Sequence, residues 1–124
     1  LGEGPHADRF TLVEGDICDA DAMAHLFGDH GFTGAIHLAA RAGVRPSIEQ
    51  PALYARVNVD WTTVLLEEAR KSDACTRFVQ ASSSSVYGNN TKVPFSEDDD
   101  VNAPISPYAA TKRACELIAS TYHS

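Results

Sequence analysis

A mostly apolar run, Ala-Ile-His-Leu-Ala-Ala at residues 35–40, decides the fold class of this chain. Its length and composition predict a strand that is buried on both faces of a sheet. Two more β-prone runs lie on either side of it, Phe-Thr-Leu-Val at residues 10–13 and Arg-Phe-Val-Gln-Ala-Ser at residues 77–82. We therefore expect three short strands at these positions.

Helical patterns alternate with these strands. Asp19 or Asp21 can cap a helix that runs to about Phe27. Apolar side chains at near-helical spacing predict a long helix over residues 51–71, and a last helix is expected from residue 107 to about 122. Residues 1–9, 41–47 and 83–105 are expected to be loops. Strands that alternate with helices predict an α/β fold with a parallel sheet and helices on both of its faces.

The composition excludes several classes of function. A net charge of -7 and a pI near 5.0 argue against a surface for nucleic acid or for an anionic membrane, although a local basic pocket stays possible. No apolar run is long enough to span a bilayer, and no signal-peptide pattern is present. The three cysteines are widely spaced and the histidines lack ligand spacing, so we expect no metal site. Free thiols fit a reducing compartment, and we expect a cytoplasmic location.

In parallel α/β sheets, ligands bind beyond the carboxyl ends of the strands. Here these ends carry Asp16, the run Ala-Ala-Arg at residues 39–41, and four consecutive serines at residues 82–85. Small residues let a flat ligand approach the backbone, and serine hydroxyls can donate or accept hydrogen bonds. The sequence therefore predicts a binding site along this edge.

The run Ser-Pro-Tyr-Ala-Ala-Thr-Lys at residues 106–112 opens the last helix. Ser106 can cap it and Pro107 suits its first turn. Tyr108 and Lys112 then share one helical face, where the ammonium would favour the phenolate and make the tyrosine an acid/base. Taken alone, an ordinary amphipathic helix with an exposed lysine explains this spacing better.

Five motifs in order resemble the extended short-chain dehydrogenase/reductases, in their sugar-nucleotide epimerase/dehydratase branch. They are Gly-Asp-Ile at 15–17, His-Leu-Ala-Ala at 37–40, Asn58, Ser-Ser-Ser-Ser-Val-Tyr-Gly at 82–88 and Tyr-Ala-Ala-Thr-Lys at 108–112. The resemblance covers nearly the whole chain from about Phe10. Residues 37–47, 81–88 and 102–112 look most like the UDP-glucuronate 4-epimerases of that branch.

The resemblance implies a Rossmann-like doubly wound parallel sheet that binds NAD. The glycine-rich dinucleotide fingerprint of that fold does not precede Phe10, and the chain begins with Leu1 rather than Met. We therefore expect residues 1–124 to be the central fragment of an NAD-binding Rossmann domain, without the N-terminal βαβ unit and the C-terminal substrate part. Two missing strands would separate residues 10–13 from 35–40, so we expect that the fragment cannot form the native sheet alone.

The resemblance also assigns roles to residues. Tyr108 would be the catalytic acid/base, Lys112 would tune it and bind the nicotinamide ribose, and Ser83 would hydrogen-bond the sugar 4-oxygen. Cofactor contacts are implied for Asp16, Ile17, Leu38, Ala39, Ala40, Arg41, Asn58, Ala81, Ser82, Tyr108 and Lys112. Substrate contacts are expected from Arg45, Ser83, Ser84 and Ser85.

Purely structural interpretations stay open for several of these residues. Asp16 can simply form a turn, and the serine run can satisfy backbone groups at a strand end. Asn58 can be a solvent-facing residue of the long helix, although a buried asparagine would need partners. Arg45 can equally be a solvated loop residue.

The implied reaction is redox-neutral: UDP-glucuronate becomes UDP-galacturonate by NAD-mediated oxidation and re-reduction at sugar C4. A carboxylated sugar is favoured by the charged and hydroxyl donors Arg45, Ser84 and Ser85. UDP-glucose 4-epimerase is a close alternative. Another NAD-dependent dehydratase or reductase is less favoured, because dehydratases of this branch carry Asp-Glu where this chain has Ser84 and Ser85. A catalytically inactive NAD-binding fragment is the alternative of another class. The full-length protein is expected to be a homodimer through its helices at 51–71 and 107–122, by analogy with the fold.

Overall fold

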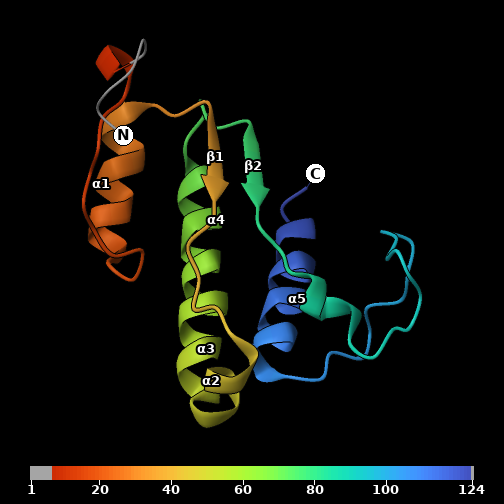
Figure 1. The fold of residues 1–124 in the computed structure, drawn as a ribbon. Coiled ribbons are helices and arrows are strands. Elements are labelled where there is room, and N and C mark those ends of the chain that lie inside the picture. The colour runs from red at the N-terminus through yellow and green to blue at the C-terminus, as the bar shows by residue number, and fades with distance from the viewer. Residues whose placement is uncertain (1–6, 124) are drawn as a thin grey trace.

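The computed structural model describes residues 7–123. Strands β1 (Gly34–His37) and β2 (Arg77–Gln80) are parallel, with Gly34 opposite Arg77 and His37 opposite Gln80. Helices α1 (Ala20–His30) and α4 (Trp61–Lys71) run alongside this pair of strands, and α5 (Pro107–Ser120) lies beside α4, mostly beyond the carboxyl ends of the strands (Figure 1). The structure confirms the expected parallel strand–helix–strand unit, with strands shorter than the apolar runs that predicted them.

Helix α1 begins where the sequence predicted. The Asp19 side chain accepts a hydrogen bond from the backbone N–H of Ala22 at 2.9 Å, which satisfies a donor that the first helical turn leaves free. Met23 and Phe27 are buried and pack with Leu65 and Ala69 of α4. Burying a large apolar side chain contributes roughly 1.5–3 kcal/mol, so this cluster fixes α1 against α4.

The sheet is covered on one face only within the described part of the chain. His37 is buried and Phe78 packs against the core, whereas Ile36 and Val79 point the other way and are 72% and 58% exposed. The prediction of a strand buried on both faces, with helices on both sides, is therefore wrong for residues 7–123. Helices that connect strands progressing in one direction across a sheet lie on the same face.

The long helix over residues 51–71 is confirmed as one column but not as one regular helix (Figure 1). It consists of α3 (Pro51–Ala55), a π-helical turn η2 (Arg56–Asp60) and α4. A further helix, α2 (Val44–Glu49), replaces part of the loop expected over 41–47. Ser47 stabilises it, because its fully buried hydroxyl donates to the Val44 carbonyl at 2.6 Å.

Residues 10–13 do not form the expected strand. Strands need a neighbour to satisfy their backbone groups, and no segment of residues 7–123 pairs with this run. Its apolar side chains Phe10, Leu12 and Val13 are 45–68% exposed. Of the loop expected over residues 1–9, only Ala7–Arg9 are described, as a short 3-10 helix η1, and the rest lies outside the described residues. Among the helices that are described, none has the length and apolarity needed to cross a membrane.

Candidate active site

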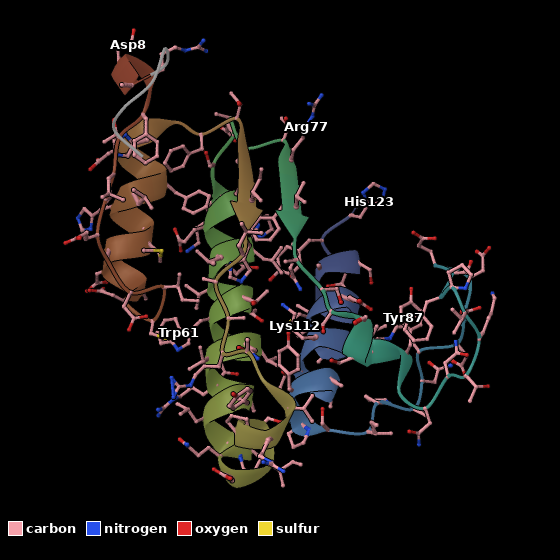
Figure 2. The ribbon with its side chains drawn as sticks, in the orientation of Figure 1. Asp8, Trp61, Arg77, Tyr87, Lys112 and His123 are labelled. Atoms are coloured by element: carbon pink, nitrogen blue, oxygen red, sulfur yellow. The ribbon has the colours of Figure 1, made fainter. Side chains whose placement is uncertain are left out.

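Helix α5 positions Tyr108 and Lys112. The hydroxyl of Ser106 accepts from the Ala109 N–H at 3.1 Å and Pro107 occupies the first helical position, as the sequence predicted. The cap fixes where the helix starts, and thereby which face carries Tyr108 and Lys112 one turn apart. Lys112 lies between α4 and α5, below the carboxyl ends of both strands (Figure 2).

Lys112 is a buried cation, only 6% exposed, and none of the acidic side chains in residues 7–123 forms a salt bridge with it. The pKa of His37, at the end of β1, is lowered by burial first and then by the nearby Lys112 ammonium. His37 is therefore neutral at pH 7, and its Nε2 forms a 2.9 Å hydrogen bond with Thr62 Oγ1. Tyr108 precedes Lys112 by one turn of the same helix.

Asn58 joins three segments that are distant in the sequence. It is 2% exposed, so the solvent-facing interpretation is wrong. Its Oδ1 accepts from the Arg41 N–H at 2.7 Å, and its Nδ2 donates to the Arg41 carbonyl at 3.1 Å and to Thr111 Oγ1 at 3.0 Å. Both amide hydrogens are thus used within the protein. Asn58 holds the loop after β1 against α5, and any cofactor contact it supports acts through that loop.

The π-helical turn η2 contributes a second contact to α5. The carbonyl of Asn58 accepts a hydrogen bond from the Cys115 thiol at 3.0 Å, and Cys115 is 1% exposed. Burial raises the pKa of this thiol, which keeps it protonated and able to donate. π-Helical turns occur often at functional sites. In η2, two hydrogen bonds fix Asn58 relative to α5: its side chain donates to Thr111, and its backbone carbonyl accepts from Cys115.

The serine run makes structural bonds at the end of β2. Ser83 accepts from the Ser85 N–H at 3.2 Å and so caps the short 3-10 helix η3 (Ser84–Tyr87), and its hydroxyl donates to Ser85 Oγ at 3.1 Å. Ser82 donates to the carboxylate of Glu116 on α5, which also pairs with Arg113 at 2.8 Å. This anchor was missed in the sequence, where only the Arg113–Glu116 spacing of three hinted at a helix-surface pair.

One cavity of about 750 Å³ brings together five of the residues predicted to bind the cofactor. They are Asp16, Ile17, Ala39, Ala40 and Arg41. Its other walls include Arg56 and Trp61, which sequence reasoning treated only as parts of a helix and its apolar stripe. Figure 2 shows Trp61 on the side of α4 that faces α1.

The lining of this cavity fits a dinucleotide. The Asp16 carboxylate forms the predicted turn by accepting from the Cys18 N–H at 2.9 Å, and this bond lowers its pKa. An ionised aspartate offers acceptors to an amino group, apolar side chains offer a surface to a flat ring, and Arg41 and Arg56 offer cations to phosphates.

Other predicted residues do not line this cavity. Leu38 lines a neighbouring, mostly apolar cavity of about 430 Å³ between α1 and β1, which shares Ile17 and Ala39 with the first. Ala81 continues the sheet, because its N–H donates to the His37 carbonyl at 3.1 Å. Arg45 lies on α2 rather than in a loop, and both Arg45 and Ser84 are exposed.

A parallel Rossmann-like unit with a tyrosine and a buried lysine one turn apart is the arrangement found in short-chain dehydrogenase/reductases. Residues 2–124 match the family model described as GDP-mannose 4,6 dehydratase, and the chain belongs to this family of NAD-dependent epimerases and dehydratases. The resemblance seen in the sequence is thereby confirmed.

Individual relatives agree with the family match. The chain is 51% identical over 112 residues to "UDP-glucuronate 4-epimerase 3" of Arabidopsis thaliana, covering 90% of this chain and 26% of that protein. It is 42% identical over 123 residues to "UDP-glucuronate 4-epimerase" of Thermodesulfobacterium geofontis, covering 99% and 38%. The crystal structure of UDP-glucose 4-epimerase from Brucella ovis in complex with NAD superposes with a TM-score of 0.82 at 34% identity, over 89% of this chain and 33% of that one. The chain thus spans 26% to 38% of the length of these relatives.

Proposed function

We propose that residues 1–124 are the central part of the NAD-binding domain of a longer nucleotide-sugar 4-epimerase that acts on UDP-glucuronate. The observation that carries this proposal is the pair Tyr108 and Lys112 on a capped helix, with Lys112 buried and without an acidic partner in residues 7–123. Thr111, between them, is bonded through Asn58 to the loop that lines the dinucleotide-sized cavity. The names of the relatives support the same reaction class.

In this proposal, Tyr108 accepts the proton of the sugar 4-hydroxyl. It returns the proton after the 4-keto sugar has rotated in the site to present its other face. The Lys112 ammonium stabilises the phenolate, and the Ser83 hydroxyl donates to the sugar oxygen. Asp16, Ile17 and the residues at 39–41 bind the dinucleotide. NAD, when bound, supplies the hydride acceptor at sugar C4.

The substrate is inferred from polar side chains in the segments that follow β1 and β2, of which Arg45 and Ser84 are exposed and Ser85 is half-buried. Arg45 would bind the glucuronate carboxylate, with Ser84 and Ser85 as further donors. UDP-glucose 4-epimerase is the second candidate, favoured by the likeness to the Brucella ovis structure. A dehydratase is disfavoured, because elimination needs an additional acid/base and η3 presents serines at those two positions.

We also propose that the full-length protein is a cytoplasmic homodimer, with the α3–α4 column and α5 at the interface. The three cysteines are free thiols, which suits a reducing compartment. Size-exclusion chromatography with light scattering measures the oligomeric state, and a monomeric full-length protein would contradict the proposed dimer.

The experiment is to express the full-length protein and to assay UDP-glucuronate, UDP-galacturonate and UDP-glucose. We expect interconversion of the two uronates and a loss of about 10²–10⁴ in kcat for Tyr108→Phe, the usual size of acid/base catalysis. Tyr122→Phe is the matched control, because its hydroxyl donates to Glu67 elsewhere on the molecule. Turnover of UDP-glucose alone would retain the acid/base roles but exclude the carboxylate role of Arg45. No turnover of any sugar would contradict the proposal.

A further inference from the structure

Tyr54 is a buried aromatic residue directly beside Tyr108. It lies on α3, is 3% exposed, and its ring centroid is 6.3 Å from that of Tyr108 at an interplanar angle of 84°. This edge-to-face arrangement is a favourable geometry for two aromatic rings. Tyr54 therefore defines one wall of the space in which the Tyr108 ring can turn.

The hydroxyl of Tyr54 is bonded to the loop after β1. It donates to the Ala42 carbonyl at 2.6 Å. The next residue, Gly43, has a φ of 105°, and a Cβ there would lie 3.3 Å from the Pro46 ring and 3.7 Å from the Tyr54 hydroxyl. Only glycine adopts this backbone readily in so small a space. The loop is thus shaped to meet Tyr54.

A second connection runs from the same loop to the backbone of Tyr108. Asn58 binds both backbone groups of Arg41 and donates to Thr111 Oγ1, and Thr111 in turn donates to the Tyr108 carbonyl at 2.8 Å. Tyr54 and Asn58 are four residues apart, one turn along the same helical column. Neighbouring residues of one loop are therefore connected to Tyr108 twice, to its backbone through Thr111 and to its ring through Tyr54.

We propose that Tyr54 is a positioning residue that holds the Tyr108 ring toward Lys112 and couples it to the loop lining the cofactor cavity. This inference rests on the proposed function, in which Tyr108 is the acid/base. Without Tyr54, the Tyr108 ring loses the aromatic neighbour packed against it and gains freedom to rotate. Tyr54 is not among the residues that line the dinucleotide-sized cavity, so we expect binding to be affected less than turnover.

The test compares Tyr54→Phe and Tyr54→Leu in the full-length protein, with Tyr122→Phe as the control that also loses one phenol hydrogen bond. We expect kcat per bound NAD to fall about 5-fold for Tyr54→Phe and about 30-fold for Tyr54→Leu, with KM for the sugar within about 3-fold. The pH at half-maximal kcat/KM should move upward in Tyr54→Leu and stay in place in the control. A solely structural role would lower the folded fraction without moving the pH profile.

A spectroscopic measurement separates this inference from the proposed function. The ionisation of Tyr108 is followed by ultraviolet difference titration between each protein and its Tyr108→Phe counterpart. An upward shift of that midpoint in Tyr54→Leu supports the positioning role even if no sugar is turned over, an outcome that contradicts only the proposed function. An unchanged midpoint, or wild-type kcat in both variants, overturns the inference. If Tyr54→Leu does not fold, the inference is judged on Tyr54→Phe alone. A lower kcat with a raised ionisation midpoint supports it, and wild-type values overturn it.

Discussion

Replacing Asn58 by leucine removes a buried amide while keeping a side chain of similar size. Three groups lose a partner: the Arg41 N–H, the Arg41 carbonyl and Thr111 Oγ1. Thr111 keeps its bond to the Tyr108 carbonyl, and the exposed position of Arg41 lets water replace part of what is lost there. We therefore take the net value of about 1 kcal/mol per hydrogen bond rather than the full desolvation penalty of about 1–3 kcal/mol per orphaned group. The expected loss is about 3 kcal/mol.

The assay is urea unfolding of the full-length protein followed by circular dichroism. Asn89→Leu is the matched control, because Asn89 is exposed and its side chain makes no hydrogen bond within residues 7–123. We expect it to change stability by less than about 0.5 kcal/mol, as surface substitutions usually do. A loss below about 1 kcal/mol for Asn58→Leu would refute the reasoning, because the three bonds would then contribute nothing beyond what water supplies.

Three further predictions concern single elements. Gly88 has a φ of 59°, and a Cβ there would collide with the Ala103 carbonyl oxygen, so Gly88→Ala should lower the melting temperature by several degrees. Gly15→Ala is the control, because a Cβ at Gly15 would have nothing within 4 Å, and it should not lower the melting temperature. Equal melting temperatures for the two variants would contradict the clash. Ser106→Ala should cost about 1 kcal/mol in urea unfolding through the lost cap, and Ser106→Asp should retain most of it; equal losses would argue against capping. Hydrogen bonds from Arg70 and then from Tyr122 lower the pKa of Glu67 to about 2, from an ordinary carboxyl pKa of 4.5. The stability that this ionised carboxylate contributes is therefore fully present above pH 4.5 and is lost as the pH falls toward 2. Tyr122→Phe should raise that pKa in a carboxyl NMR titration, and an unchanged value would exclude the phenol as a cause.

Local chemistry predicted the helix starts well. Asp19 and Ser106 act on N–H groups three residues away, so the sequence contains everything needed to place the starts of α1 and α5. Strand identity was also predictable for β1 and β2, because both runs are short and β-prone and lie between helical patterns. That Tyr108 and Lys112 share one helical face follows from their spacing of four, whereas their assignment as an acid/base pair depended on the family resemblance.

Features that depend on distant contacts were not predictable. Residues 10–13 have β-propensity, but a strand forms only beside another strand. The interruption of the long helix at η2 depends on contacts that join Asn58 to Arg41, Thr111 and Cys115, which are 17 to 57 residues away. Tyr54 and Glu116 were missed for the same reason, since their partners at Ala42 and Ser82 are 12 and 34 residues away in the sequence.

The π-helical turn η2 also determines how the side chains before it are oriented relative to those after it. In an uninterrupted α-helix the residues from Tyr54 to Leu65 would turn by about 1100°, close to three full turns, and both would share one face, whereas the wider π turn of η2 lowers that rotation by about 100°. Tyr54 and Asn58 consequently face α5, while Leu65 and Ala69 face α1. A one-residue deletion in α4 before Leu65 would turn Leu65 and Ala69 by about 100° away from α1, whereas a deletion within η2 would remove the π turn and leave both groups in place. The exposed segment around Val93, itself 90% exposed, has no such phase to keep and can vary in length.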